Sequence, residues 1–361
     1  MSWHLLYLMA WLAAALLGWL ATWCCRWLAP RWGFVDKPKN EAHKNHRQAT
    51  PVLGGLGMCL AWLAVIGGGI VAVRIMPAVM GEDIRRFLPG IASVKGPLLV
   101  IMAGSVAITA LGILDDRKAM KALPKFLGQA LIAGVTAWLG VRVTCLGPNP
   151  VVNWLVTTLW IMTVINALNF FDNMDGLAGG TAMIAAFFLL FIAAIRGQHF
   201  VAMLAAVTSG VSAGFLLHNA PPARIFMGDG GSHFLGYGLG VMGALTTFYV
   251  PGESPTPAPL LIPLLVLLLP LFDAVAVVCI RLRAGLPIYV GDNRHISHRF
   301  VQLGLSRPSA VLLVCLLCFI GGAGALTLLW LPPSGILLIM AQLAAMLAVI
   351  SIIQFNRTKE Q

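Results

Sequence analysis

The sequence has few charged residues. They make up 10% of its 361 residues, whereas a soluble domain carries about a quarter. A further 59% of the residues are hydrophobic, and the mean hydropathy is +0.88. A chain with so little charge cannot cover a water-facing surface, so the composition excludes an ordinary soluble protein. It indicates that most of the chain lies in a lipid bilayer.

Several familiar site patterns are also absent. No glycine-rich loop ends in Gly-Lys-Ser or Gly-Lys-Thr, which argues against a Walker A phosphate loop. The seven cysteines nearly all lie in or beside apolar runs, so they indicate small buried side chains rather than a disulfide framework. The net charge of +11 is spread over short segments between apolar runs, without interleaved aromatic residues, so no nucleic-acid partner is expected.

Long apolar runs are abundant instead. Runs of about 18 or more residues are typical of transmembrane helices, and we predict an all-α, polytopic membrane protein with about eleven of them in one domain, residues 1–361. The predicted spans are 4–25, 52–74, 97–114, 127–145, 151–169, 178–196, 199–217, 231–250, 258–280, 308–331 and 333–355. Of the 24 lysines and arginines, 18 follow odd-numbered spans or lie in the C-terminal tail. Because basic residues favour the cytoplasmic side, we expect the N-terminus outside and the C-terminus in the cytoplasm.

The acidic residues are concentrated on the same predicted side. Nine of the 13 lie at cytoplasmic ends of spans, and Asp273 lies inside the ninth span. A charged side chain at the centre of a membrane helix costs roughly 2.5–3.5 kcal/mol, so these carboxylates are candidate functional residues. They belong to five polar clusters, which follow spans 1, 3, 5, 7 and 9. The sequence therefore predicts that all five clusters meet at one membrane face.

The first three clusters combine basic and acidic groups. The first includes Arg47, a candidate phosphate ligand in a basic segment. The second is the pair Asp115-Asp116, followed by Lys125. Adjacent carboxylates repel, which raises the pKa of one of them and suits a general base or a metal ligand. The third is a polar stripe at spacing three, which shares one helix face and offers the oxygen ligands that Mg²⁺ prefers. It consists of Asn166, Asn169, Asp172 and Asp175.

The last two clusters indicate an anion site. The fourth contains a glycine-rich turn before a predicted helix, where free backbone N–H groups favour anions. Asp229 within this turn is a candidate Mg²⁺ ligand. The fifth holds two histidines three residues apart beside an arginine, a set suited to phosphate or uridine. Together with the first three clusters, they predict a diphosphate site. The remaining candidates are Asn219 and Arg224 in the fourth cluster, and His295, His298 and Arg299 in the fifth.

These motifs, in this order and spacing, resemble those of the polyprenyl-phosphate N-acetylhexosamine-1-phosphate transferases, a family with WecA-like, TagO-like and MraY-related members. The resemblance runs from about Asp36 to Arg299 and rests on LGILDD, NALNFFDNMDGLAGG, PPARIFMGDGGS and DNRHISHR. It implies an enzyme of a bacterial inner membrane. This enzyme would use Mg²⁺, or Mn²⁺ in its place, to transfer a sugar phosphate from a UDP-N-acetylhexosamine to undecaprenyl phosphate. UMP would leave, and the product would start a lipid-linked cell-envelope glycan such as lipopolysaccharide.

The resemblance also implies roles for individual residues. Asp229 matches the Mg²⁺ aspartate, with Asp172 as a further candidate ligand. Asp115 would be the base for the lipid phosphate, with Asp116 as its partner, and a covalent aspartyl route stays open. The implied catalytic residues are Asp115, Asp116, Asp172 and Asp175. The implied substrate-binding residues are Arg47, Lys125, Asn169, Asn219, Arg224, His295, His298 and Arg299.

Two positions depart from the motifs of that family. Its usual His-x-His-His carries Ser297 here, and its usual Asp-Gly-x-Asp-Gly carries Asn173. Because this loop is closer to the WecA-like form than to the triple histidine of MraY, UDP-GlcNAc is preferred over UDP-MurNAc-pentapeptide as donor. A secondary transporter is the distant alternative, disfavoured because the carboxylates lie at helix ends and no repeat is visible. The exposed apolar belt leaves room for a homodimer.

Overall fold

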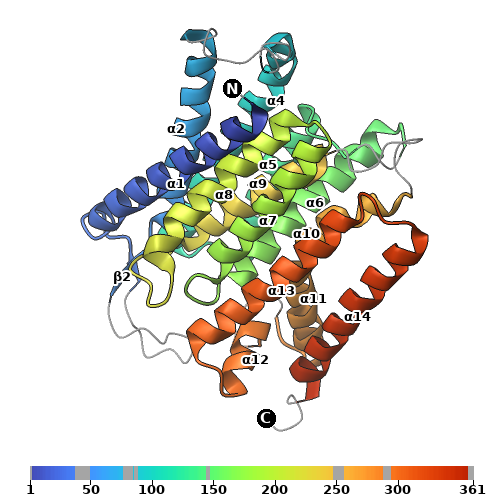
Figure 1. Cartoon of the computed structure of the whole chain (residues 1–361). Coiled ribbons are helices and arrows are strands. Elements are labelled where there is room, and N and C mark those ends of the chain that lie inside the picture. Colours follow the sequence, from blue (N-terminus) through green and yellow to red (C-terminus); the bar gives the residue numbers. More distant parts are fainter. Residues whose placement is uncertain are drawn as a thin grey trace.

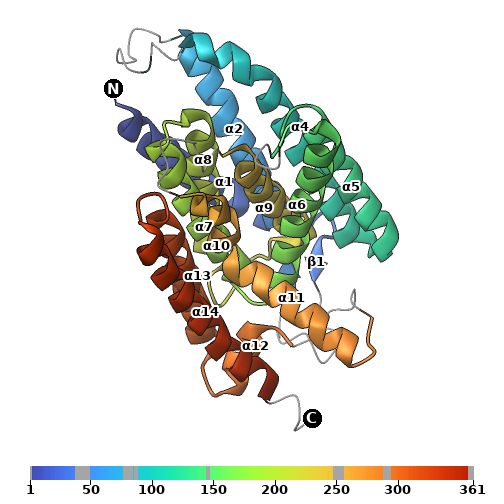
Figure 2. The same cartoon turned by 90° about the vertical axis from the view of Figure 1, so that its right-hand side faces the viewer.

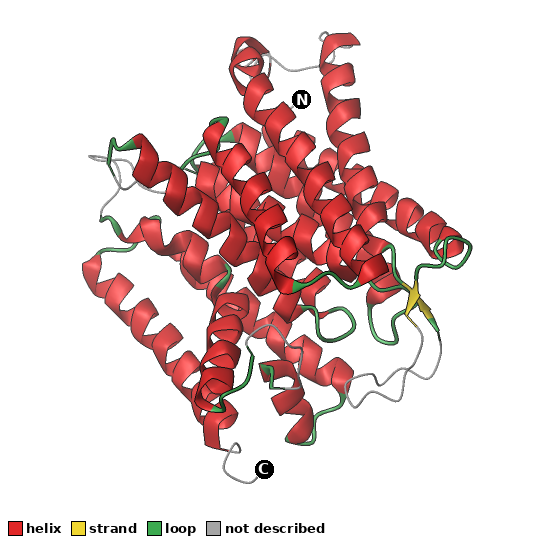
Figure 3. Cartoon of the chain, turned by 180° about the vertical axis from the view of Figure 1, so that it is seen from behind, coloured by secondary structure: helices red, strands yellow, loops and turns green. Residues whose placement is uncertain are grey.

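The computed structural model describes residues 2–36, 49–75, 84, 88–143, 147–246, 256–287 and 294–356. These residues are almost entirely helical (Figures 1 and 3), which confirms the predicted all-α class. One small sheet lies among them, in which β1 (Val35–Asp36) pairs antiparallel with β2 (Thr50–Pro51). The helices are α1 (Trp3–Leu28), α2 (Gly54–Ile75), α4 (Leu88–Lys118), α5 (Ala122–Trp138), α6 (Pro150–Phe171), α7 (Leu177–Ile195), α8 (His199–Asn219), α9 (Gly228–Leu245), the 3₁₀ helix η2 (Ala258–Leu261), α10 (Ile262–Val266), α11 (Leu268–Arg283), α12 (Ile296–Gln302), α13 (Arg307–Thr327) and α14 (Pro333–Asn356).

Every predicted span overlaps a helix or a bent pair of helices. Eight helices in the described part of the chain are long and apolar enough to cross a membrane, or nine if the bent pair counts as one span. The bent pair is Ala258–Val266 with Leu268–Arg283, which meet at 71°. Neither α5, with 17 residues, nor α9, with 18, is among the eight. A multi-pass membrane protein is therefore confirmed, whereas the count of eleven spans stays a prediction.

The centre of the bundle is formed by α7, α8 and α9. Side chains on these helices are largely buried, while α1 and α14 turn most of their residues outward. Helix α1 lies along α8, and α9 is packed between α4 and α6 (Figures 1 and 2). The most enclosed helix, α9, begins at Gly228-Asp229, which places the predicted glycine-rich turn at the end of the buried core.

Glycines at spacing four allow the closest helix contacts. Gly210 and Gly214 of α8 touch the backbone of α1, and Gly236 and Gly240 of α9 touch the backbone of α6 at Ile165 and Ile161, respectively. Lipid gives helices no hydrophobic reason to associate, so membrane helices pack where small residues let their backbones approach. These contacts fix α9 against α6 and thereby fix the spacing between the two helices that carry Asp229 and the predicted polar stripe.

The two ends of the helical body differ in their polar content. The start of α1 and the end of α14 lie at opposite ends (Figures 1 and 2). Helices α4, α6 and α8 all run toward the end at which α14 finishes, and the segments that follow them carry the predicted polar clusters. The predicted arrangement of the termini on opposite sides agrees with this course of the chain. Which side faces the cytoplasm stays a prediction.

Candidate active site

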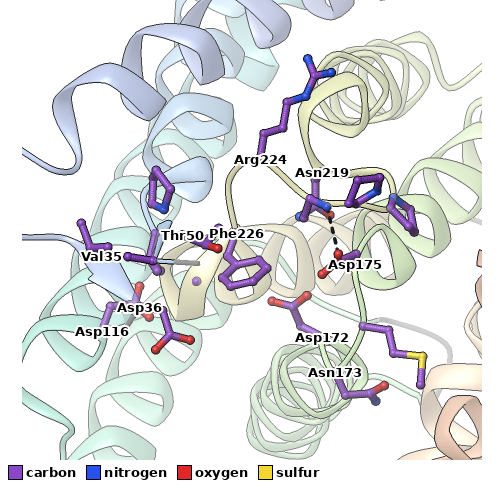
Figure 4. A pocket seen from close by; sticks show the side chains of 18 of the residues that line it. Val35, Asp36, Thr50, Asp116, Asp172, Asn173, Asp175, Asn219, Arg224 and Phe226 are labelled. Carbon is purple, nitrogen blue, oxygen red and sulfur yellow. Dashed lines mark hydrogen bonds between the residues drawn. The ribbon is translucent and has the colours of Figure 1, made fainter. Parts of the chain in front are cut away.

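A cavity of about 1,420 Å³ lies at this end of the bundle. Segments that are distant in the sequence contribute to it: the β1 and β2 strands, the end of α4, the loop after α6, the loop between α8 and α9, and the starts of α12 and α13. Aspartates from several of these segments lie around it, with Arg224 in the same lining (Figure 4). The polar lining consists of Asp36, Asp116, Asp172, Asp175 and Asp229, with Arg26, Arg117, Arg224, Arg307, His298, Asn173 and Asn219.

One wall is made by pairing the segment after β2 with the segment before α9. The N–H of Gly54 donates to the carbonyl of Phe226 over 3.0 Å, and the N–H of Gly55 donates to the carbonyl of Met227 over 2.9 Å. The N–H of Phe226 donates back to the carbonyl of Pro51 over 2.9 Å. At this close approach a Cβ on Gly55 would overlap the backbone of Gly231 at the start of α9, which explains the glycine at position 55.

Asp116 holds the N-terminus of α9. Its carboxylate accepts hydrogen bonds from the backbone N–H groups of Asp229 over 2.8 Å and of Gly230 over 3.2 Å. The first N–H groups of a helix have no partner within the helix, and a carboxylate there also complements the helix dipole. Gly228 has φ +68°, a backbone conformation that favours glycine. This turn presents the side chain of Asp229 to the cavity.

Lys125 is surrounded by three acceptors. Its Nζ lies 2.7 Å from the Asp115 carboxylate and 2.5 Å from the Asp229 carboxylate, and 3.4 Å from Oδ1 of Asn169. The Lys125 side chain is 18% exposed, so water screens these contacts only in part. The backbone N–H of Met120 also donates to Asp115, over 2.6 Å. Lys125 therefore connects Asp115, of the aspartate pair at the end of α4, to Asp229, in the glycine-rich turn at the start of α9.

Asn169 orients the other side of Asp229. Its Nδ2 donates to Oδ1 of Asp229 over 2.7 Å and to the Ser232 hydroxyl over 2.9 Å. One Asp229 oxygen is thus engaged by Lys125 and the other by Asn169. Because three helices supply these contacts, the position of the Asp229 carboxylate is set by the packing of α5 and α6 against α9.

A second polar layer lies one helical turn deeper. The side chain of Asn166 donates to Gln129 over 2.7 Å, and Gln129 donates to Nε2 of His233 over 3.2 Å. Gln129 and His233 are fully buried. They lie four residues after Lys125 and Asp229 on the same helix faces, and Asn166 lies three residues before Asn169. Lys125, Asp229 and Asn169 thus each have a polar side chain one turn deeper on the same helix, and those below Lys125 and Asp229 are fully buried.

Asp172 has a carboxylate whose hydrogen-bonding capacity is left for a ligand. It lies just past the end of α6 and faces the cavity (Figure 4), and no hydrogen bond from a described residue reaches its side chain. Desolvation, together with the nearby charges of Asp229, Asp116 and Asp175, raises the pKa of Asp172 to about 8. Repulsion among these carboxylates is offset when a cation lies between them.

The donor set fits Mg²⁺ that is shared with a phosphate-bearing substrate. No group of three acidic, histidine or cysteine side chains in the described part of the chain is arranged to hold a metal ion alone. Mg²⁺ at phosphoryl-transfer sites commonly uses one or two carboxylates and completes its octahedron with phosphate oxygens and water. Asp172 and Asp229 both line the cavity and supply that number of carboxylates.

Asp175 and Asn219 hold the walls together. Asp175 accepts a hydrogen bond from the N–H of Ala223 over 2.9 Å. Asn219 is almost fully buried; it accepts from the N–H of Gly176 over 2.9 Å and donates to the carbonyl of Ile225 over 2.8 Å. Both side chains therefore fasten the loop after α6 to the loop between α8 and α9, while they also line the cavity.

The predicted residues of the fifth cluster, His295, His298 and Arg299, lie partly in the cavity wall and partly in the core. His298 lines the cavity. His295 is 5% exposed and pairs through Nδ1 with the fully buried Asp273 over 2.6 Å. Arg299 is 4% exposed and donates to Gln302 over 2.9 Å. Of the three substrate-binding residues predicted here, His298 is thus the one that the structure places in the cavity wall.

The structure brings together most of the predicted site residues. Asp115, Lys125 and Asn169 form the cluster around Asp229, while Arg47 lies outside the described residues. The roles of all of these residues stay predictions. Sequence reasoning missed Arg26 and Arg307 as lining residues, because they counted only as basic residues at span ends. It also missed the buried polar residues Gln129 and His233, for which no motif gave a signal, and it gave no role to Ser232, the last residue of the PPARIFMGDGGS motif.

Comparison with known proteins identifies the family. Residues 98–247 match the family model described as glycosyl transferase family 4. Over 305 residues the chain is 32% identical to a Bacillus subtilis protein named probable undecaprenyl-phosphate N-acetylglucosaminyl 1-phosphate transferase, covering 82% of this chain and 77% of that protein. The chain belongs to glycosyl transferase family 4. The resemblance inferred from the motifs is therefore confirmed.

Other relatives in the family carry two kinds of name. A decaprenyl-phosphate N-acetylglucosaminephosphotransferase of Mycolicibacterium smegmatis is 32% identical over 356 residues, which cover 91% of this chain and 84% of that protein. A phospho-N-acetylmuramoyl-pentapeptide-transferase of Geobacillus kaustophilus is 31% identical over 237 residues, covering 60% of this chain and 68% of that protein. The alignments to the N-acetylglucosamine group thus extend over more of the chain.

Proposed function

We propose that this protein transfers N-acetylglucosamine-1-phosphate from UDP-N-acetylglucosamine to undecaprenyl phosphate and releases UMP. The observation that carries the proposal is the Lys125 cluster, in which one cation joins Asp115 and Asp229 beside a cavity lined with arginines. Two relatives whose names specify N-acetylglucosamine phosphate transfer to a polyprenyl phosphate support the same chemistry.

The proposed reaction is a phosphoryl transfer between two anionic substrates. An oxygen of the lipid phosphate forms a bond to the phosphorus that carries the sugar, the phosphoanhydride bond to the other phosphorus breaks, and UMP leaves. Little covalent chemistry is required of the protein beyond positioning and charge neutralisation. Bound Mg²⁺ would supply positive charge on the diphosphate, and Asp172 and Asp229 are the residues that would hold it.

The remaining roles in the proposed reaction are assigned to side chains of the protein. We assign to Lys125 the neutralisation of the incoming lipid phosphate, since its ammonium group lies between two carboxylates, one of which, Asp229, lines the cavity. Asp115, held by Lys125 and by the N–H of Met120, takes the proton of a singly ionised lipid phosphate. Arg224 and Arg307 line the cavity and are suited to the nucleotide phosphates.

The direct test is nucleotide release by the purified protein in detergent. The assay contains Mg²⁺ and undecaprenyl phosphate with UDP-GlcNAc, UDP-GalNAc or UDP-MurNAc-pentapeptide in separate reactions. We expect lipid-dependent release of UMP that is fastest with UDP-GlcNAc and is abolished by EDTA. Fastest release with the pentapeptide donor would instead assign the chain to the activity named for the Geobacillus kaustophilus relative. No release with any donor from folded protein would contradict the proposal.

A further inference from the structure

One hydrogen bond joins the short helix α12 to the loop after α6, and both of these segments contribute to the cavity wall. The hydroxyl of Ser297, in α12, donates to Oδ1 of Asn173, in the loop after α6, over 2.5 Å. Ser297 has no exposed surface, so its hydroxyl cannot exchange this partner for bulk water. A buried hydroxyl that loses its partner is left unsatisfied, so the contact strongly constrains the position of α12 relative to the loop after α6.

The amide of Asn173 is fixed at both ends. Its Nδ2 donates to the carbonyl of Phe170 in the last turn of α6, over 3.1 Å, so its Oδ1 is turned toward Ser297. Asn173 follows Asp172 directly, and His298 follows Ser297 directly; both of these neighbours line the cavity. The hydrogen bond thus connects the residues next to an acidic and an imidazole group that face the same space.

The short helix α12 is also fastened on its other side. Asp273 of α11 accepts from the N–H of Ile296 over 2.8 Å and pairs with His295 over 2.6 Å. Gln354 of α14 donates to the carbonyl of Arg294 over 3.2 Å. These contacts hold α12 to α11 and α14, and none of them involves the loop after α6. The bond from Ser297 to Asn173 links α12 to the loop after α6.

Asn173 and Ser297 are also the two positions at which the chain departs from the motifs it resembles. Where those motifs carry glycine and histidine, this chain carries asparagine and serine. This chain therefore has two residues of intermediate size in contact with each other at positions where the motifs have the smallest residue and an imidazole. Because Ser297 is fully buried, an imidazole at this position would have to occupy the space that Asn173 fills.

We propose that Asn173 and Ser297 are a matched pair of positioning residues, which sets the distance between Asp172 and His298 and can be exchanged only as a pair. Neither residue needs to touch the reacting groups; each acts through its neighbour in the cavity wall. The inference rests on the proposed function in so far as the cavity is the catalytic site. The contact and the complementary sizes of the two side chains do not depend on that function.

The test is a reciprocal exchange in four proteins: wild type, Asn173→Gly, Ser297→His and the double variant. We expect each single variant to lower kcat/KM for the UDP-sugar by at least about tenfold, and the double variant to recover to within about threefold of wild type. Ser212→Ala is the matched control. Ser212 is also fully buried, but its hydroxyl bonds within α8, so this variant should keep wild-type turnover. A double variant impaired by the product of the two single effects would overturn the proposal.

A second set of variants and a second measurement allow the pairing to be tested even if one of the four proteins does not fold or has no activity. If Ser297→His does not fold alone, Ser297→Ala and Asn173→Ala replace the exchange, and their double variant is expected to lose no more than the worse single variant. Melting temperatures in detergent are measured on the same proteins, because they report the pairing without any substrate. Should the wild type turn over no sugar nucleotide, the proposed function fails. The pairing of Asn173 with Ser297 is then tested by melting temperature alone. It is supported if the double variant regains the melting temperature that the single variants lose, and it is contradicted if the double variant does not.

Discussion

Lys125 is the residue on which the contacts of the acidic cluster converge. Its ammonium group is the one described cation that bonds to both Asp115 and Asp229, and it also reaches Asn169. A charge placed in advance where negative charge gathers needs no reorganisation during the reaction. Removing this ammonium leaves Asp115 and Asp229 without a cation between them. The lipid phosphate would then approach two uncompensated negative charges.

Lys125→Met is therefore expected to lower kcat by about 100-fold or more, since removing one preorganised electrostatic contact typically costs that much. The variant keeps the apolar stem, which limits the loss of packing. UMP release measures the effect, and Lys121→Met is the control, because Lys121 is exposed and lies one turn earlier in the sequence. A Lys125→Met variant within about threefold of wild type would remove Lys125 from the catalytic cluster.

The raised pKa of Asp172 predicts a pH-dependent need for Mg²⁺. With a pKa of about 8, this carboxyl is mostly protonated at neutral pH until a cation displaces the proton. Apparent Mg²⁺ affinity should consequently rise as the pH rises from about 6 to 8, by up to about tenfold per unit, and level off above. Half-maximal Mg²⁺ concentrations measured across this range test the effect, and Asp172→Asn should remove the slope. An equal slope in that variant would mean that another group titrates.

Motif reasoning located the polar residues but could not assign their partners. Asp273 and His295 were recognised from their chemistry, one as a carboxylate inside a span and the other as a substrate contact. The two residues are 22 positions apart in the sequence, and part of the segment between them lies outside the described residues. Spacing rules apply within one helix, so they carry no information about a contact between α11 and α12.

At the scale of the elements, the position of α9 depends on how closely α2 approaches it. A Cβ at Gly55 would overlap the backbone of Gly231, whereas Gly67, three turns further along α2, faces open space. We expect Gly55→Ala to destabilise the protein by about 1–3 kcal/mol, because the overlapping atoms are backbone and cannot turn aside. Activity should fall with stability, since Asp229 lies in the first turn of α9.

Gly67→Ala is the matched control for Gly55→Ala. It makes the same chemical change in the same helix and should be neutral or stabilising by about 0.5–1 kcal/mol, because alanine favours a helix over glycine. Thermal unfolding in detergent compares the two variants. Equal melting temperatures would show that the contact between α2 and α9 does not constrain the site.

The elements show where periodicity succeeds and where it fails. Apolar length located α1, α6 and α13 to within a few residues of their observed limits. The run at 258–280 reads as one span, yet the chain breaks at Leu267 between α10 and α11 with a 71° bend. Hydropathy does not distinguish a straight helix from a broken one, since every residue around the break is apolar. The break directs α11 and its Asp273 toward the histidine loop.

At the scale of the whole molecule, the side of the membrane that the cavity faces is a separate prediction. The unequal distribution of lysine and arginine places the cavity on the cytoplasmic side. UDP-sugars do not cross a bilayer, so sealed inside-out vesicles should turn over added UDP-GlcNAc without detergent, whereas right-side-out vesicles should require permeabilisation. Activity in intact right-side-out vesicles alone would reverse the assigned orientation.

The central claim is that the sugar and its phosphate move as one unit to the lipid phosphate. The most direct measurement is mass spectrometry of the lipid product, with the released nucleotide identified in the same reaction. The account predicts a lipid diphosphate heavier than the substrate by one N-acetylglucosamine phosphate, together with an equal amount of UMP, formed by the wild type and, about 100-fold or more slowly, by Lys125→Met. A lipid that gains the sugar without its phosphate, with UDP as the released nucleotide, would contradict it.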